Sequence, residues 1–337
     1  MYSRDVLNKM IFLSKITKKM SNQFYDFISQ YIDNAREQLI QIIKPNGMLP
    51  GIGDSESYSG RDVLKYACSN VEKYKSIFCY ENVDEYLMKN DIVFDKGGYA
   101  IFRSSWNDKA DEATWMLFNA ATFSSTHKHG DDLEVLLYHK GDLFVEGGKR
   151  DYNYLDEKTA WSYSSFAHNV LVVNDKPFPV KIGSNGFQSI YPEALDTKIV
   201  DYDIEDEVKS VCGYQKRYEG IEQYRTLEYD KENNIIRIID DIKANMIYNG
   251  SLLWHIDPEV VVVLEKNDIK FFRNDENIAI AHIESDSAYD IEMIQGEGEY
   301  PYYTYTFANG EQRNGGLLKI NFVGDEITKI VLNIELK

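Results

Sequence analysis

Histidines and carboxylates are concentrated in one part of this sequence. Residues 124–148 read SSTHKHGDDLEVLLYHKGDLFVEGG, and four of the chain's six histidines fall between positions 127 and 168, namely His127, His129, His139 and His168. Neutral imidazole rings bind zinc and similar metal ions, and a carboxylate is their usual companion ligand. If the segment is a strand, His127 and His129 share one face, because alternate side chains of a strand do. The residue types therefore indicate a metal and catalytic site.

The spacing alone leaves two alternatives open. No HExxH motif is present, and a metal-free sugar-binding face, on which the histidines only donate hydrogen bonds, would explain the same residues. A cupin-like metal enzyme would need a further ligand about two residues past His129, where Asp131 stands. The carboxylates available as companions are Asp131, Asp132, Glu134, Asp142 and Glu146.

The residues before position 90 have the apolar spacing of helices. Apolar side chains recur every three or four positions over 6–13 and again over 24–43, as in amphipathic helices with one buried face. Pro45-Asn46-Gly47 would end the second helix, and Ser59-Gly60-Arg61-Asp62 resembles a capping box that opens another. These helices are either the remainder of a larger helical domain or a small helical cap.

After Gly97 the period changes to that of strands. Short segments rich in β-branched and aromatic residues follow one another, separated by turn signals such as 230–234. No helical patterns lie between them, which argues against a parallel α/β sheet and favours an antiparallel sandwich. We therefore expect an α+β chain, with a helical part at 1–92 and a large antiparallel β-sandwich at 93–337. The clearest predicted strands are 99–102, 133–138, 170–173, 224–229, 235–239 and 330–336.

Charge and composition narrow the partners. The net charge is −18, whereas nucleic acids and anionic membranes select basic surfaces, so we expect no nucleic-acid partner. No apolar run approaches the roughly 18 residues of a membrane span. The cysteines Cys68, Cys79 and Cys212 are odd in number and lack CxxC spacing, which argues against a disulfide framework and a thiolate metal site. The 25 tyrosines are typical of β-rich proteins and of sugar-binding surfaces.

Five motifs, in order, resemble those of the heparinase II/III-like polysaccharide lyases and their alginate lyase relatives. HKHGD at 127–131, LFVEGG at 143–148 and AHNV at 167–170 carry most of the resemblance. LPGIGDS at 49–55 resembles the end of the family's helical toroid, and GGYAIFRS at 97–104 resembles its first sandwich strand. The resemblance implies the C-terminal remnant of an (α/α) toroid followed by the sandwich, with substrate bound in the cleft between them.

The same resemblance implies a metal centre. One zinc ion would be held in the sandwich by His129, His168 and Glu146, although the family usually has aspartate at the position of Glu146. His127 would face the substrate, and Asp131 would orient a strand or a histidine.

The implied chemistry is β-elimination on a uronic acid, so the partner would be an acidic polysaccharide or oligosaccharide. The site neutralises the uronate carboxylate, a base removes the C5 proton, and an acid protonates the departing O4. The candidates for catalysis are His127, Tyr163 and Tyr2, the last as the end of the family's Glu-x-Ser-x-x-Tyr segment. Arg150 and Tyr152 would line the cleft.

The sequence departs from the family in its helical part. The family's toroid is several times longer than 90 residues and contributes an Asn-His pair, but no histidine precedes His127. We therefore expect a lyase that is complete only with a further N-terminal portion or a partner chain. The alternative is a truncated lyase-like protein that binds polysaccharide without cleaving it. Homo-oligomer formation is left open.

Overall fold

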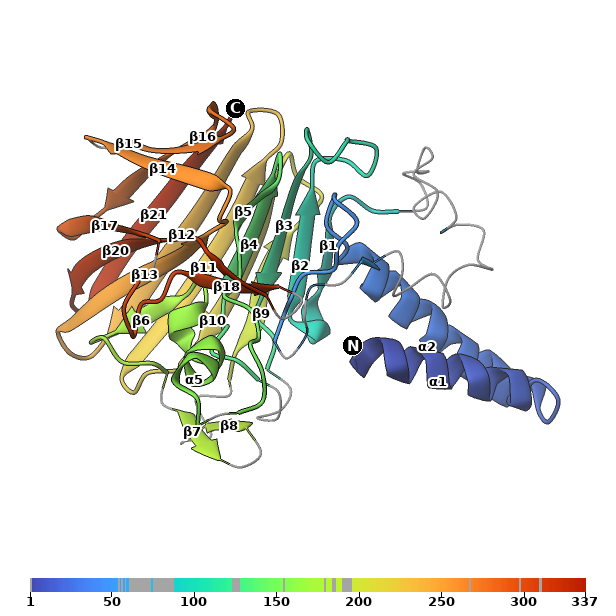
Figure 1. Cartoon of the computed structure of the whole chain (residues 1–337). Coiled ribbons are helices and arrows are strands. Elements are labelled where there is room, and N and C mark those ends of the chain that lie inside the picture. The colour runs from blue at the N-terminus through green and yellow to red at the C-terminus, as the bar shows by residue number, and fades with distance from the viewer. Residues whose placement is uncertain are drawn as a thin grey trace.

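Two large antiparallel sheets make up most of the computed structural model (Figure 1). The structure describes residues 2–53, 55, 57, 59–60, 74, 88–122, 128–153, 155–178, 180–183, 186–189, 196–266, 268–296, 298–308 and 311–337. Within these residues three α-helices accompany the sheets. The expectation of helices followed by antiparallel strands is confirmed, whereas the described helices do not form a toroid.

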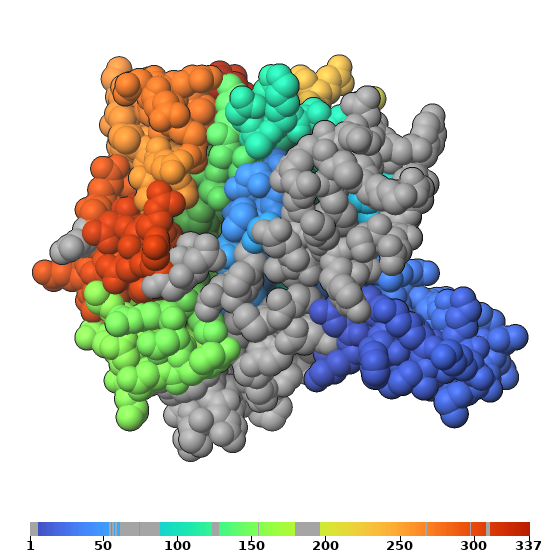
Figure 2. Space-filling view, turned by 45° about the vertical axis from the view of Figure 1, so that its right-hand side comes forward, coloured from blue at the N-terminus to red at the C-terminus, as the bar shows by residue number. Residues whose placement is uncertain are grey.

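Helices α1 (Tyr2–Thr17) and α2 (Asn22–Gln41) form a hairpin that extends away from the sheets (Figures 1 and 2). Their buried faces meet through Leu7, Ile11 and Ile32, as the apolar spacing predicted. Phe24 and Phe27, which the same spacing placed on the buried stripe, are exposed instead. The third helix, α5 (Glu157–Tyr163), lies against the sheets. None of the described helices has the length and apolar character needed to cross a membrane. Arg61 and Asp62 of the predicted capping box lie outside the described residues.

The first sheet has nine strands. Their order is β1-β2-β3-β4-β5-β13-β20-β17, and β6 also pairs with β13. The strands are β1 (Ile92–Phe94), β2 (Tyr99–Arg103), β3 (Thr114–Asn119), β4 (Glu134–His139), β5 (Asp142–Phe144), β6 (Leu171–Val173), β13 (Tyr248–Ile256), β17 (Tyr289–Gln295) and β20 (Gly316–Gly324).

The second sheet has eight strands in the order β14-β15-β16-β21-β12-β11-β10-β9. They are β9 (Lys198–Asp203), β10 (Val208–Gln215), β11 (Ile221–Asp230), β12 (Ile235–Ala244), β14 (Val260–Glu265), β15 (Asp268–Arg273), β16 (Glu276–Ser285) and β21 (Ile327–Leu336). Two short hairpins complete the strands, β7 (Val180–Gly183) with β8 (Gly186–Ser189) and β18 (Tyr305–Ala308) with β19 (Glu311–Asn314).

The main apolar core lies between the two sheets. Alternate side chains of each strand point into it, because neighbouring residues of a strand face opposite sides. Strand β11 buries Ile221, Leu227 and Tyr229 in this way, yet Arg225 occupies the same inward phase. Its cross-strand neighbour Asp240 on β12 is equally buried. The core therefore contains a charged pair.

Polar contacts attach the helical hairpin to the outer face of the first sheet. Arg103 of β2 donates to the carbonyl of Ile43, just beyond the end of α2, at 2.6 Å. Lys44 pairs with Asp142 of β5 at 2.7 Å. The segment that follows α2 is thereby held beside β4 and β5, where the predicted site lies.

Candidate metal centre

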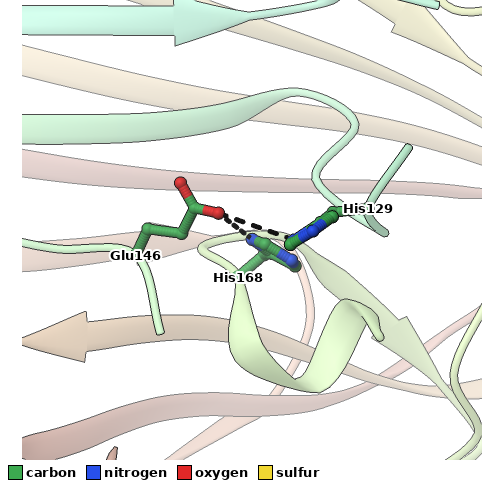
Figure 3. Close-up of side chains that lie close together, drawn as sticks. All are labelled: His129, Glu146 and His168. Carbon is green, nitrogen blue, oxygen red and sulfur yellow. Dashed lines mark ion pairs between the residues drawn. The ribbon is translucent and has the colours of Figure 1, made fainter. Parts of the chain in front are cut away.

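Loops at the ends of three strands of the first sheet bring His129, Glu146 and His168 together. His129 precedes β4, and Glu146 lies two residues after the end of β5. His168 lies between the short 3₁₀ helix η2 (Ser165–Ala167) and β6. Figure 3 shows the three side chains converging, and their candidate ligand atoms all lie within 4.8 Å of one another.

The carboxylate of Glu146 is shared by the two histidines. Its Oε1 atom lies 3.7 Å from Nδ1 of His129 and 3.7 Å from Nδ1 of His168 (Figure 3). One nitrogen of each ring and one carboxylate oxygen could serve as ligand atoms; in a tetrahedral zinc site such atoms are roughly 3.4 Å apart, because metal–ligand distances are about 2.1 Å. The exposed fractions of the three residues are 2%, 8% and 0% in chain order. This buried group could hold a metal ion.

Several buried polar atoms of the group lack a hydrogen-bond partner among the described residues. Both carboxylate oxygens of Glu146 and both ring nitrogens of His168 are buried, without a hydrogen-bond partner among the described residues. A buried polar group left unpaired costs about 1–3 kcal/mol, and more when it is charged. Folded proteins rarely contain such atoms. A bound cation would pair with the carboxylate of Glu146 and with one ring nitrogen of His168, so the residues fit a metal.

The two aspartates after His129 are already neutralised by cations. Lys128 pairs with Asp131, and it lies 3.3 Å from Asp132. Arg217 pairs with Asp132 at 2.8 Å. Although burial acts in the opposite direction, Arg217 and Lys128 hold the pKa of Asp132 at about 2. Burial also opposes Lys128 at Asp131, where the pKa is nevertheless lowered. Both aspartates are therefore occupied as structural ion-pair partners.

Glu134 and Glu146 form no ion pair with a lysine or arginine among the described residues, although the charge of Lys128 and the N–H of Gly53 oppose the effect of burial at Glu146. Among the ion pairs of the described residues, their only partners are His129 and His168. Burial, and after it the charges of Glu134 and Asp131, raise the pKa of Glu146 well above its ordinary value. A divalent cation would favour the charged carboxylate, since metal ligands must be deprotonated.

A buried amide fixes the chain beside His168. The side-chain Nδ2 of Asn169 donates to the carbonyls of Val135 and Val145, each at 3.0 Å. Its Oδ1 accepts the backbone N–H of His255 at 2.6 Å. These bonds join the end of β5, the start of β4 and β13 around one side chain. The amide thus sets the position of His168 relative to Glu146.

The charged pair in the core supports the same loops. Arg225 donates to the carbonyls of Asn169 at 2.6 Å and Leu133 at 2.9 Å. Its other donors reach both carboxylate oxygens of Asp240, at 2.8 and 3.0 Å. The second sheet therefore holds the loops of the first sheet that carry the candidate metal residues.

Tyr163 lies directly beside the candidate metal group. Its ring centroid is 4.2 Å from that of His129, and only 1% of the residue is exposed. Its hydroxyl donates to the backbone carbonyl of Asp151 at 3.3 Å. The structure thus places Tyr163 next to a predicted ligand. The side chain of Tyr2 and the whole of His127 lie outside the described residues, so their predicted catalytic roles stay predictions.

Arg150 and Tyr152 lie on the segment that joins Glu146 to α5. Arg150 pairs with Asp156 at 3.2 Å. Tyr152 is 49% exposed, and Nζ of Lys149 lies 3.8 Å from the centre of its ring. Lys149, Arg150 and the exposed ring of Tyr152 thus lie within six residues of Glu146 in the sequence. A substrate-binding role for it remains a prediction.

The sequence interpretation did not single out Arg225 or Asp240. The signal was present, because both residues occupy the inward phase of strands whose other inward residues are mostly apolar. A charged residue in such a phase must be paired when it is buried. Two of them on neighbouring predicted strands therefore indicate a buried ion pair.

Comparisons with known proteins agree with this architecture. Residues 88–314 match the family described as heparinase II/III-like, C-terminal. Heparan sulfate lyase HepC from Pedobacter heparinus superimposes with a TM-score of 0.78 at 14% identity, over 100% of this chain and 52% of that one. A crystal structure of heparinase III gives 0.77 at 16% identity, over 99% and 53%. This chain thus spans about half the length of these structures. No curated protein sequence matches it.

Proposed function

The chain belongs to the heparinase II/III-like family of polysaccharide lyases, and on that premise we propose that it forms the metal-bearing part of a lyase for uronic-acid-containing polysaccharide. The observation that carries the proposal is the buried group of His129, Glu146 and His168 within the matched region. In this proposal residues 1–92 are the C-terminal remnant of a toroid, and residues 93–337 are the sandwich. An acidic polysaccharide or oligosaccharide would bind between them.

We assign one zinc ion to His129, Glu146 and His168. When bound, it would supply a fixed positive charge and hold three loops of the first sheet in one arrangement. A ligand that binds only the folded chain stabilises it. Imidazole nitrogens and a carboxylate oxygen are the ligand types that zinc prefers.

The reaction proposed for the complete protein is β-elimination at a uronate. A base removes the C5 proton, the C4–C5 double bond forms, the C4–O4 bond breaks, and an acid delivers a proton to O4. His127 and Tyr2 are our candidates for these proton transfers. Tyr163 is buried against His129, which favours a role in holding that ring.

In this proposal the segment after Gly148, which contains Arg150 and Tyr152, contacts the substrate. The guanidinium of Arg150 can bind a uronate carboxylate, since planar donors suit carboxylate oxygens. The half-exposed ring of Tyr152 can pack on a sugar ring. Both residues follow Glu146 closely in the sequence, which is why we place substrate beside the metal group.

Polysaccharide binding without cleavage is the second candidate function. No histidine precedes His127 in the sequence, and the chain spans about half the length of the lyase structures it matches. A lyase that takes catalytic groups from a longer helical domain would lack them here. Glycan binding without product would then be the expected behaviour of this chain alone.

Two measurements on the 337-residue chain test the proposal. The first is the ultraviolet absorbance of unsaturated uronate during incubation with alginate, heparan sulfate, hyaluronan or glucuronan. Product on any polymer supports the lyase and excludes the binding-only alternative. Binding without product favours the alternative. Absence of both binding and product, for a folded chain with and without added helical domain, would contradict the proposed substrate class.

The second measurement is metal content by elemental analysis. We expect one zinc ion per chain in the wild type and its loss in His129→Ala and His168→Ala. His127→Ala is the matched control, because our assignment gives it no ligand role and it should keep the metal. A folded wild-type chain that takes up no metal would contradict the assigned centre, whatever the outcome of the lyase assay.

A further inference from the structure

A second buried glutamate lies against His168. Glu134 is the first residue of β4 and is 1% exposed. Its Oε1 lies 3.4 Å from Nδ1 of His168, a shorter separation than the 3.7 Å between His168 and Glu146. The same oxygen accepts the backbone N–H of Asn169 at 3.1 Å. One carboxylate oxygen thus lies beside both the ring of His168 and the peptide that follows it.

Glu134 is outside the group that could coordinate directly. In the described residues, the ligand atoms that all come within 4.8 Å of one another belong to His129, Glu146 and His168 only. Oε1 of Glu134 is also engaged by a backbone N–H. The position is that of an outer carboxylate, beside a ligand but not among the ligands.

The protein fixes Glu134 through its backbone. Glu134 pairs across the sheet with Asn119 of β3. The preceding residue, Leu133, has a φ of 63°, and its carbonyl accepts from Arg225. Because Arg225 also holds the carbonyl of Asn169, one guanidinium sets the distance between the start of β4 and the loop of His168. The carboxylate is therefore held in place by the fold.

We propose that Glu134 is a positioning residue that fixes the ring orientation of His168: when a metal is bound, Nδ1–H would be donated to Glu134, whose Oε1 lies 3.4 Å away, and Nε2 would face the metal. Histidines that bind metals usually donate their second ring N–H to a carboxylate or carbonyl, and this raises the basicity of the ligand. Glu134 and Glu146 together also match the charge of a divalent cation. The proposal rests on the metal centre proposed above, but not on lyase activity.

The test compares metal binding by the wild type and Glu134→Gln. Glutamine keeps the volume and an acceptor for the N–H of Asn169, but it removes the charge next to His168. We expect the variant to keep one zinc ion at saturation and to lose about 10- to 100-fold in affinity, measured by competition with a chromophoric chelator. The absorption spectrum of the cobalt(II)-loaded protein should also shift, because the electron donation of His168 changes.

Two comparison variants give the test its reference points. Asp257→Asn neutralises another buried carboxyl group, directly after β13, whose cationic partner is Arg273, and it should leave zinc affinity unchanged. His168→Ala removes a ligand and should abolish stoichiometric binding. If Glu134→Gln fails to fold, Glu134→Asp takes its place, since the shorter side chain withdraws the carboxylate from the ring and should also weaken binding.

The outcomes separate the possible roles. Wild-type affinity in a folded Glu134 variant would overturn the proposal. Loss of zinc as complete as in His168→Ala would overturn it in another way, because Glu134 would then be a direct ligand. A wild-type chain that binds no zinc would remove the metal centre and this inference together, while the result of the uronate assay would stand independently.

Discussion

Glu146 and His168 carry four polar atoms that are buried without a hydrogen-bond partner among the described residues. At the scale of single residues, these buried polar groups point to a function rather than to a role in packing. An apolar residue at either position would remove the cost of burial, yet the chain keeps groups whose pairing needs a cation. Lys128 and Arg217 neutralise the neighbouring aspartates. Among the described residues, Glu134 and Glu146 form ion pairs only with histidines.

The stability of the metal-free protein should depend on pH through Glu146. Its pKa is raised in the folded chain, chiefly by burial, so the folded state binds the proton more tightly than the unfolded state does. The free energy of unfolding should therefore be highest at acidic pH and fall as pH rises from about 4.5 through the raised pKa. The slope is at most about 1.4 kcal/mol per pH unit for one proton. Urea unfolding of chelator-treated protein measures it.

Glu146→Gln is the control for this pH dependence. The variant cannot ionise at position 146, so the difference in stability between the two proteins should grow with pH. Added zinc should stabilise the wild type increasingly at higher pH and have little effect on Glu146→Gln. A wild-type curve parallel to that of the variant would contradict the assignment of the raised pKa to Glu146.

Residue type and motif were sufficient to single out His129, Glu146 and His168 in the sequence, and the structure brings these three together. The same reasoning could not choose Glu134 among five nearby carboxylates. Its position beside His168 depends on the pairing of β4 with β3 and on the buried contacts of Asn169. The contacts of Asn169 join residues 34 and 35 positions apart, and no local pattern specifies them.

At the scale of elements, the pair Arg225 and Asp240 connects the two sheets. Both side chains are buried, and the guanidinium is shared between the carboxylate and the carbonyls of Asn169 and Leu133. A buried ion pair is tolerated when its remaining donors are hydrogen-bonded. Here those donors act on the loops that carry the candidate site, so the stability of the core and the geometry of the site are coupled.

Asp240→Ala should therefore destabilise the chain strongly. The change leaves the Arg225 guanidinium buried without its counter-charge, which typically costs about 3–5 kcal/mol. Urea unfolding measures the loss. The neighbouring Asp241→Ala is the matched control, because Asp241 is half exposed and pairs with Lys329 only at 3.6 Å; its loss should cost less than about 1 kcal/mol. Equal effects of the two substitutions would contradict the structural role of the pair.

The existence of the strands could be predicted, but their neighbours could not. β-Branched and aromatic residues indicated strands at 224–229 and 235–239, which form the paired strands β11 and β12. The pairing of β5 with β13 joins Phe144 to Ile256, more than 100 residues apart. Each strand can form hydrogen bonds along either of its two edges. The sequence of β5 therefore does not specify β13 as its neighbour, and only the packing of the complete sheet does.

At the scale of the whole molecule, the helical hairpin leaves large apolar side chains exposed. Figures 1 and 2 show it extending from the sheets, and Arg103 and Lys44 bind the segment at its end. Large apolar side chains are exposed on both helices, among them Phe12, Met20, Phe24 and Phe27, at 64%, 79%, 52% and 56%. Exposed apolar groups of this extent usually mark an interaction surface.

We therefore expect the chain to associate through α1 and α2 when no other polypeptide covers them. Covering one phenylalanine contributes about 1.5–3 kcal/mol, so the combined substitution Phe12→Glu and Phe27→Glu should shift sedimentation toward the monomer. Zinc content should not change, because the metal group lies on the first sheet. Ile327→Glu, at an exposed apolar residue of β21, is the control and should leave association unaltered. A wild-type chain that stays monomeric at all concentrations and binds no hydrophobic dye would contradict this prediction. It would show that the apolar face of α1 and α2 is stable in water without a partner.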